Sequence, residues 1–326
     1  MKKYHVVTIG SCVRDIIFYT DQAEFLKNPK DDPTKLYLLA FEYGAKIKSD
    51  EIKYSFGGGA SNTAVNFSGL GLNTGIISCL GKDGLGLEVR NRLKVKKVDV
   101  NLLKQSKKLP TGISFLVVDK KSNEHFVLVS YGSNNELNIS APDLKKFSTD
   151  WFYVSSLSSP AWPQIMSNVI KQNKKIAWNP GNTQLKAGYP KLKKFLKDTD
   201  LLLLNKDEAI ELCLSAGIRM RNWSAKKLAE IIWDWGVELS CVTEGQKGVW
   251  IYDGQKYFFG KPHHGKPKDT TGAGDCFGST LVAGLIKRNG DINTAINLAI
   301  ANTTSLVFTP GAQEGLLPWN QLIKKV

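Results

Sequence analysis

A glycine-rich turn that ends in an aspartate lies near the C-terminal end of the chain, at Asp269–Asp275 (DTTGAGD). The segment Cys276–Lys287 has apolar residues at helical spacing, so a helix is predicted after the turn. The first N–H groups of a helix are unpaired and carry the positive end of its dipole, which suits phosphate. An aspartate would repel a bound phosphate, so phosphate binding alone does not explain Asp275. It fits a site where a nucleophile loses a proton beside a phosphoryl group, although a capping role would also explain it.

An earlier glycine run, Gly57–Asn62 (GGGASN), also leads into a predicted helix, Ala60–Leu70. Its spacing is G-x-G-x-x-N, so the third glycine of a dinucleotide-binding fingerprint is missing. No acidic residue ends a following strand at the expected distance. The run therefore argues against a nicotinamide-dependent oxidoreductase and indicates a tight backbone turn before a helix.

Composition narrows the class of protein. The chain has 326 residues, enough for one large α/β domain or two smaller ones. No apolar run reaches the roughly 18 to 20 residues that span a bilayer, and Val6–Gly10 is interpreted as a buried strand rather than part of a signal peptide. The five cysteines show no C-x-x-C pair, which argues against a disulfide framework or a zinc site and predicts a cytoplasmic protein.

The charge balance is strongly basic. Lysine and arginine number 44 against 30 acidic residues, a net charge of +14. Such a surplus steers anionic ligands such as nucleotides or sugar phosphates. The sequence has no zinc-finger pattern, RNP pattern or arginine-rich arm, so we expect a solvated basic surface and no nucleic-acid partner.

Buried-strand and helix patterns alternate along most of the chain. Strands are predicted at Val6–Gly10, Gly75–Leu80, Trp151–Ser155, Lys175–Asn179, Leu201–Asn205 and Leu239–Thr243. Helices are predicted at Ala60–Leu70, Gly86–Lys96, Pro163–Gln172, Lys206–Leu214, Ala225–Trp235, Cys276–Arg288 and Ile292–Val307. The alternation predicts an α/β fold with a doubly wound, mainly parallel sheet and helices on both faces.

Two regions break this alternation. Strands are predicted over Leu36–Glu42 and Lys46–Phe56, and a hairpin over Gly112–Asp119 and Glu124–Tyr131. We expect these regions, about residues 36–56 and 112–131, to form a small β-sheet that projects from the core as a lid. The same sheet offers a surface for a homodimer. Asp21–Lys35, which is polar and carries two prolines, is predicted to be a loop.

Together these motifs resemble the ribokinase (PfkB) family of carbohydrate and nucleoside kinases. The resemblance covers nearly the whole chain and depends on motifs at Gly10-Ser11 with Asp15, Phe56–Asn62, Gly81–Gly84, Asn205–Glu208, Thr243–Gly245, Asp269–Asp275, Thr309–Gln313 and Leu317–Trp319. Their order and spacing are specific where one motif alone would be weak. The resemblance implies a ribokinase-like kinase domain over residues 1–326. It also implies Mg²⁺-dependent, in-line transfer of the γ-phosphoryl group of ATP to an alcohol.

The resemblance assigns roles at the phosphoryl group. Asp275 would be the base that takes a proton from the acceptor hydroxyl. Asn205 and Glu208 match an N-x-x-E motif and would face a Mg²⁺–phosphate cluster through water, although the helix dipole alone would favour a carboxylate at Glu208. The backbone N–H groups that stabilise the transferring phosphoryl group would be those of Gly272, Ala273 and Gly274.

It also assigns roles around the two substrates. The acceptor hydroxyls would be held by Asp15, Gly58 and Asn62, because a carboxylate and an amide suit a polyol. Asn179 is a weaker candidate, since an N-P-G turn alone would explain it. The nucleotide would be approached by Asn205, Thr243, Gly245 and Asn302. Asp269 and Thr271 match positions where some members of the family place a monovalent cation, and that site is left open.

The acceptor is the least determined part of the prediction. A hydroxymethyl group of a small sugar is the first hypothesis. The segments Trp178–Gln184 and Pro318-Trp319 look like those of archaeal-type nucleoside kinases, so a nucleoside is the main alternative. A phosphosugar would need basic residues in the pocket, for which Arg14 is the candidate. A non-catalytic ligand-binding member is the alternative of another class, which the intact Asp275 argues against.

Overall fold

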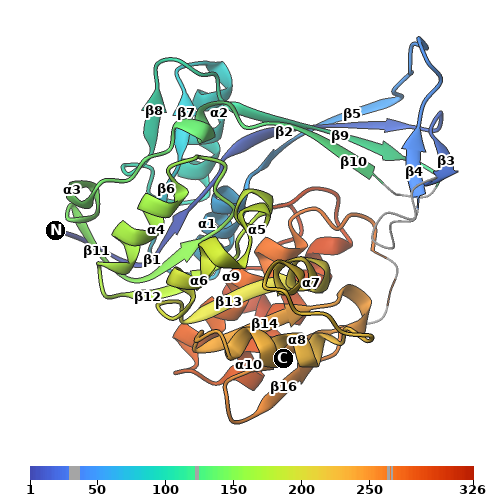
Figure 1. The fold of residues 1–326 in the computed structure, drawn as a ribbon. Helices are drawn as coiled ribbons and strands as arrows, with labels where there is room; N and C mark the ends of the chain where they lie inside the picture. The colour runs from blue at the N-terminus through green and yellow to red at the C-terminus, as the bar shows by residue number, and fades with distance from the viewer. Residues whose placement is uncertain (29–36, 122–124, 263–264, 266) are drawn as a thin grey trace.

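In the computed structural model, a twisted eight-stranded sheet forms the centre of the chain (Figure 1). The structure describes residues 1–28, 37–121, 125–262, 265 and 267–326. The strand order is β16 (Tyr257–Gly260), β15 (Val249–Tyr252), β14 (Leu239–Thr243), β13 (Leu201–Asn205), β12 (Lys175–Trp178), β11 (Phe147–Val154), β1 (Lys2–Ile9) and β6 (Thr74–Ile77). The strands from β14 to β6 are parallel, and β15 and β16 are antiparallel. The predicted mainly parallel sheet is confirmed.

Helices cover both faces of this sheet, as predicted. One face is covered by α4 (Trp162–Ile170), α5 (Asn182–Ala187), α6 (Tyr189–Leu196), α7 (Lys206–Ser215) and α8 (Ala225–Trp233). The other is covered by α1 (Gly59–Gly69), α9 (Ala273–Lys287) and α10 (Ile292–Val307). Successive residues of β11 alternate between the two cores: Phe152 packs in the first and Tyr153 in the second.

Three further helices and a second pair of strands complete the body. They are α2 (Gly84–Val95), α3 (Ala141–Leu144), α11 (Trp319–Leu322) and the parallel pair of β7 (Cys79–Gly81) and β8 (Lys104–Ser106). The single strand predicted over Gly75–Leu80 is therefore split, because β6 pairs with β1 and β7 pairs with β8. No helix within the described ranges is long and apolar enough to cross a membrane. All five cysteines are buried and unpaired.

The predicted second sheet projects from the body, with boundaries that differ from the prediction (Figure 1). We name it the lid sheet; its order is β10 (His125–Ser130), β9 (Gly112–Asp119), β2 (Val13–Thr20) and β5 (Glu51–Gly57). The central strand β2 is missing from the prediction, because adjacent charged residues at its start interrupt the apolar pattern. The strand resolves this by directing Arg14 and Asp15 to opposite faces.

The segment before β5 differs from its predicted structure. The expected loop over Asp21–Lys35 contains a strand, β3 (Glu24–Lys27), which pairs with β4 (Tyr37–Ala40) in a separate two-stranded sheet. The strand expected over Leu36–Glu42 therefore does not join the lid sheet. Residues 29–36 and 122–124 lie outside the described residues, and with them Leu36, Glu124 and part of the hairpin turn.

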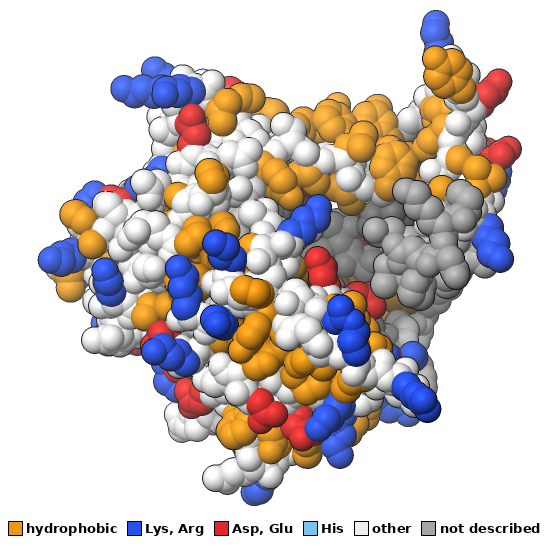
Figure 2. All heavy atoms as spheres, in the orientation of Figure 1, with side chains coloured by type: hydrophobic (Ala, Val, Ile, Leu, Met, Phe, Trp, Pro, Cys, Tyr) orange, Lys and Arg blue, Asp and Glu red, His pale blue; other side chains and the backbone are white. Residues whose placement is uncertain are grey.

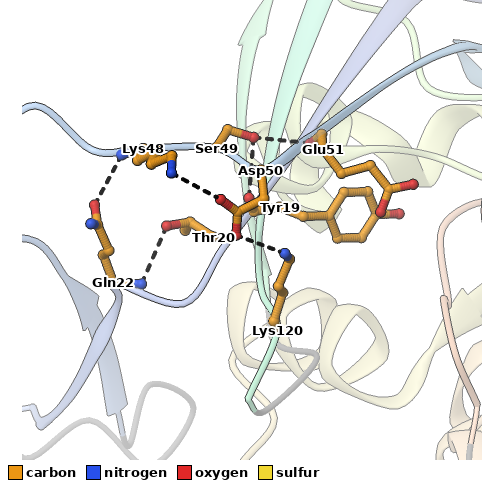
Figure 3. Close-up of polar contacts among 8 residues, drawn as sticks. All are labelled: Tyr19, Thr20, Gln22, Lys48, Ser49, Asp50, Glu51 and Lys120. Atoms are coloured by element: carbon orange, nitrogen blue, oxygen red, sulfur yellow. Dashed lines mark hydrogen bonds and ion pairs between the residues drawn. The ribbon is translucent and has the colours of Figure 1, made fainter.

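Polar contacts hold the far end of the lid sheet (Figure 3). Lys120, after β9, forms an ion pair with Asp50, before β5, at 3.0 Å. The Ser49 hydroxyl donates to the carbonyl oxygens of Tyr19 and Glu51. These exposed contacts join the ends of three lid strands, and each contributes little stability by itself.

Candidate active site

The turn before α9 lies between two cavities. Gly272 adopts the left-handed conformation, with φ of 74°, and the helix begins directly after it. Ala273 and Gly274 line one cavity of about 260 Å³. Gly272 and Asp275 line the other, of about 280 Å³. The helix start that the sequence assigns to phosphate is therefore the wall between two ligand-sized spaces.

The second cavity brings together predicted residues from distant parts of the chain. Asp15 on β2, Gly58 and Asn62 at the start of α1, and Asp275 on α9 all line it. Gly58 has φ of 91°, and a β-carbon there would overlap the backbone of Ser11, so a side chain would be strained and would collide. We name this space the acceptor cavity.

Asp15 is held at the edge of the acceptor cavity with little access to solvent. Its side chain is 5% exposed and accepts a hydrogen bond from the hydroxyl of Ser114 on β9. Burial raises the pKa of Asp15 to about 6, while the Ser114 hydroxyl opposes the rise. The charges of Asp269 and Asp275 raise it further. The sequence prediction missed Ser114, whose only signal is a small polar residue within an apolar strand.

Asp275 accepts a hydrogen bond from the side-chain amide of Asn62, 2.8 Å from Nδ2 to Oδ2. Burial raises the pKa of Asp275, and the Asn62 amide opposes this by favouring the ionised carboxylate. The pair joins the starts of α1 and α9. In its ionised form, a carboxylate at the wall between two cavities is suited to accept a proton from a hydroxyl group.

The first cavity is largely apolar and is lined by two of the residues predicted to approach the nucleotide. Thr243 and Gly245 line it, together with Val249, Ile300 and Phe308. We name this space the nucleotide cavity.

Asn302 does not line the nucleotide cavity. It is fully buried, and its Nδ2 donates to Asn66 Oδ1 at 3.0 Å and to Thr280 Oγ1 at 2.9 Å. Its Oδ1 accepts from the N–H of Leu317. Helical spacing turns Asn302 towards α1 and α9, and the next residue, Thr303, faces the cavity instead. The expected contact of Asn302 with the base is therefore absent from this arrangement.

Asn205 and Glu208 form a reciprocal cap at the start of α7. Asn205 Oδ1 accepts from the Glu208 N–H, and Glu208 Oε2 accepts from the Asn205 N–H, both at 2.8 Å. Burial raises the pKa of Glu208 to about 7, and nearby acidic residues including Asp275 raise it further. Neither residue lines the nucleotide cavity, but the influence of Asp275 indicates that Glu208 is near the turn.

The donor set at this point suits a hydrated Mg²⁺ ion better than a metal held by the chain alone. The described residues contain no group of three His, Cys, Asp or Glu side chains that could hold a metal. Glu208 retains Oε1 beyond its cap and carries a destabilised negative charge when ionised. Mg²⁺ keeps several waters and is commonly held by one or two carboxylates and substrate phosphates.

Two further predicted residues take structural contacts. Asn179 donates to the Leu203 carbonyl at 2.9 Å and does not line the acceptor cavity. Asp269 accepts from the N–H groups of Thr271 and Gly311, both at 2.8 Å. The buried Thr271 hydroxyl has no hydrogen-bond partner within the described residues, which is compatible with the cation position left open above.

Comparison with known proteins shows the family to which the chain belongs. A model of the pfkB family of carbohydrate kinases matches residues 3–320. The ribokinase of Haemophilus influenzae is 26% identical over 278 residues, 84% of this chain and 88% of that protein. The ribokinase of Giardia lamblia shares the fold, with a TM-score of 0.80 at 22% identity and full coverage of both chains. The nucleoside kinase of Burkholderia thailandensis, solved with inosine, gives 0.79 at 17% identity, covering 97% of this chain and 96% of that one. Because the family model matches nearly its whole length, this protein belongs to the pfkB family of carbohydrate kinases.

Proposed function

We propose that this kinase transfers the γ-phosphoryl group of ATP to a hydroxymethyl group of a small sugar. One observation carries the proposal: the turn before α9 presents Asp275 to the acceptor cavity and Ala273 and Gly274 to the nucleotide cavity. A phosphoryl group at this turn would lie between a donor on one side and a hydroxyl on the other. Direct in-line transfer follows, with no covalent intermediate on the chain.

Each side chain then has one task. Asp275 takes the proton of the attacking hydroxyl, and the hydrogen bond from Asn62 favours the ionised form of its carboxylate. Asp15 accepts hydrogen bonds from other hydroxyls of the acceptor and fixes its orientation. The N–H groups of Gly272, Ala273 and Gly274 stabilise negative charge on the transferring group. Mg²⁺ held near Asn205 and Glu208 would neutralise phosphate charge.

The lid sheet forms one wall of the acceptor cavity and would exclude water from it. Asp15 and Ser114 face the acceptor from this sheet, with apolar neighbours such as Leu116 and Val129. Water that reaches the phosphoryl group competes with the acceptor, and an apolar wall reduces that competition.

A nucleoside is the second candidate acceptor, and the same apolar wall favours it. Four apolar residues of the lid sheet, and the aromatic residue directly after β10, line the acceptor cavity: Val13, Leu116, Val127, Val129 and Tyr131. A free sugar offers little apolar surface to them, whereas a nucleobase offers a flat one. The structurally similar B. thailandensis nucleoside kinase was solved with inosine.

A phosphosugar is disfavoured because Arg14 faces away from the acceptor. Its guanidinium stacks on Phe56, 4.2 Å from the ring centre, donates to the Ser55 carbonyl and pairs with Glu88. The described residues that line the acceptor cavity include no lysine or arginine. A second phosphate would therefore find no cation among them.

The opposite face of the lid sheet supports the homodimer expected from the sequence. Tyr54, Ile16, Phe115 and Leu128 lie in register across its four strands, on the face away from Asp15. Tyr54 is 64% and Leu128 58% exposed, and Figure 2 shows hydrophobic side chains along the top of the view, over the lid. A second copy of the chain would bury this row. Light scattering should then show a dimer that Leu128→Glu converts to a monomer; a wild-type monomer contradicts the proposal.

Release of ADP from Mg·ATP tests the kinase proposal. The panel contains free sugars, sugar phosphates and nucleosides, and Asp275→Asn serves as the blank. We expect one acceptor class to give ADP release that falls by roughly 10²- to 10⁴-fold in Asp275→Asn, with ATP affinity unchanged. Substantial turnover in the variant would rule out Asp275 as the base. ATP binding without acceptor-dependent ADP release across the panel would favour the non-catalytic alternative.

A further inference from the structure

We propose that Gln313 is a positioning residue for Asp275 and acts through Asn62. The inference rests on the proposed role of Asp275 as the base. Gln313 lies in the loop after α10 and is 2% exposed. Its Nε2 donates to Asn62 Oδ1 at 3.0 Å and to Ser61 Oγ at 3.1 Å. Three polar side chains from three distant segments are therefore linked by hydrogen bonds in a series that ends at the carboxylate of Asp275.

The carboxylate of Asp275 determines which group donates and which accepts in these hydrogen bonds. An ionised carboxylate only accepts hydrogen bonds, so Asn62 must present its NH₂ group to Asp275. The Asn62 carbonyl oxygen then points to Gln313, which must donate to it. Reversing Asn62 would place its carbonyl oxygen against the carboxylate and its NH₂ against the NH₂ of Gln313. Gln313 thus holds Asn62 in the orientation that favours an ionised Asp275.

A purely structural role does not explain why a glutamine is buried at position 313. Within the described residues, its buried Oε1 has no hydrogen-bond partner. Burial of an unsatisfied amide oxygen costs free energy that an apolar side chain of similar size would avoid. A glutamine at this position is explained by what its NH₂ group does for Asn62.

The loop that carries Gln313 is fixed to the active-site turn by other contacts. The N–H of Gly311 donates to Asp269 at 2.8 Å, and Ala312 packs against Gly272. Beyond Gln313, Glu314 forms an ion pair with Arg92 of α2 at 2.7 Å. The loop therefore places the Gln313 amide accurately, and substitution of Gln313 alone leaves these anchors in place.

The variant Gln313→Met tests the proposal, because methionine matches the length of glutamine and donates no hydrogen bond. Without its donor, Asn62 is free to turn, and protonated Asp275 becomes more favourable. At saturating acceptor, where the titration of Asp15 no longer contributes through the acceptor KM, we expect the acid limb of the pH profile of kcat to move to higher pH. The loss should be about fivefold below the limb and smaller above it. Gln321→Met, the same substitution at an exposed position of α11, is the matched control and should leave the limb unchanged.

Two further measurements test whether Gln313 acts on Asp275 through Asn62. In an Asn62→Ala background, Gln313→Met should cause no additional shift, because the connection to Asp275 is already cut. The ¹³C carboxyl resonance of Asp275, assigned with Asp275→Asn, should titrate at higher pH in Gln313→Met than in wild type, and this readout needs no turnover. A loss of activity that is equal at all pH values, or an unchanged Asp275 titration, would overturn the proposal. Absence of acceptor-dependent ADP release in wild type would instead overturn the kinase function. The NMR titration would still test whether Gln313 acts on Asp275 through Asn62.

Discussion

Gly57 on β5 lies directly against the carboxylate of Asp15 on the adjacent strand β2. A β-carbon at position 57 would overlap Oδ2 of Asp15. The lid sheet therefore brings a buried carboxylate to the acceptor cavity only because the neighbouring strand has no side chain at this point. Glycine here is required by close approach and not by an unusual backbone angle.

Gly57→Ala should displace Asp15 and weaken acceptor binding without affecting the nucleotide. We expect the acceptor KM to rise by about tenfold, as for the loss of one hydrogen bond to a charged group, with unchanged ATP affinity. Steady-state kinetics with each substrate varied in turn measure both. Gly69→Ala is the control, since Gly69 has open space around its α-carbon. A rise in the ATP KM alone would mean that the two cavities are assigned the wrong way round.

Acceptor binding should depend on pH through Asp15. Its pKa of about 6 means that the carboxylate becomes a full hydrogen-bond acceptor only as the pH rises through that value. The acceptor KM should therefore fall between about pH 5 and about pH 7 in wild type and be nearly flat in Asp15→Asn. A pH dependence that is retained in Asp15→Asn would assign the titration to another group.

Glu208→Gln should raise the Mg²⁺ requirement. At a pKa of about 7, Glu208 holds a proton that the cation must displace, so Mg²⁺ activation of wild type should strengthen as the pH rises through 7. We expect about a tenfold higher Mg²⁺ requirement in the variant and loss of this pH dependence. Glutamine keeps an oxygen for the Asn205 N–H, so the cap of α7 is retained. Mg²⁺ titrations of ADP release measure the effect, and identical titrations would contradict it.

The same carboxyl group gives a stability test without Mg²⁺. The pKa of Glu208 is higher in the folded chain than its ordinary value of 4.5, so the unfolded chain loses this proton first. Wild type should therefore lose stability relative to Glu208→Gln as the pH rises from about 4.5 through about 7. Thermal unfolding at several pH values measures the difference, and a difference that grows in the opposite direction would contradict the raised pKa.

Gly278→Ala should destabilise the fold, and Tyr153→Phe should rescue it. Gly278 of α9 packs against the Tyr153 hydroxyl, which a β-carbon would overlap. That hydroxyl is buried without a hydrogen-bond partner in the described residues, so its removal costs little. We expect Gly278→Ala to lower the free energy of unfolding by roughly 1–3 kcal/mol, and the double variant to recover most of it. Denaturant unfolding of all four proteins measures the coupling; additive effects would contradict the contact.

Strand and helix positions in the body were largely predictable from local pattern. The strands β11 to β14 fall within a few residues of their predicted ranges, because parallel strands buried on both faces are continuous apolar runs. The lid was harder. β2 has charged residues at its start, and its pairing with β9 is with a strand far away in the chain, which no local pattern reveals.

Features that depend on neighbouring residues follow from the sequence alone. The glycine turn before α9, the cap formed by Asn205 and Glu208, and the motif order that identifies the family all follow from short segments. The packing of distant segments sets which side chains meet. It joined Asn62 to Asp275, 213 positions apart, added Gln313 to them, and turned Asn302 into the core. Local backbone geometry is set by nearby residues, whereas side-chain partners from distant segments depend on how the sheet and helices pack.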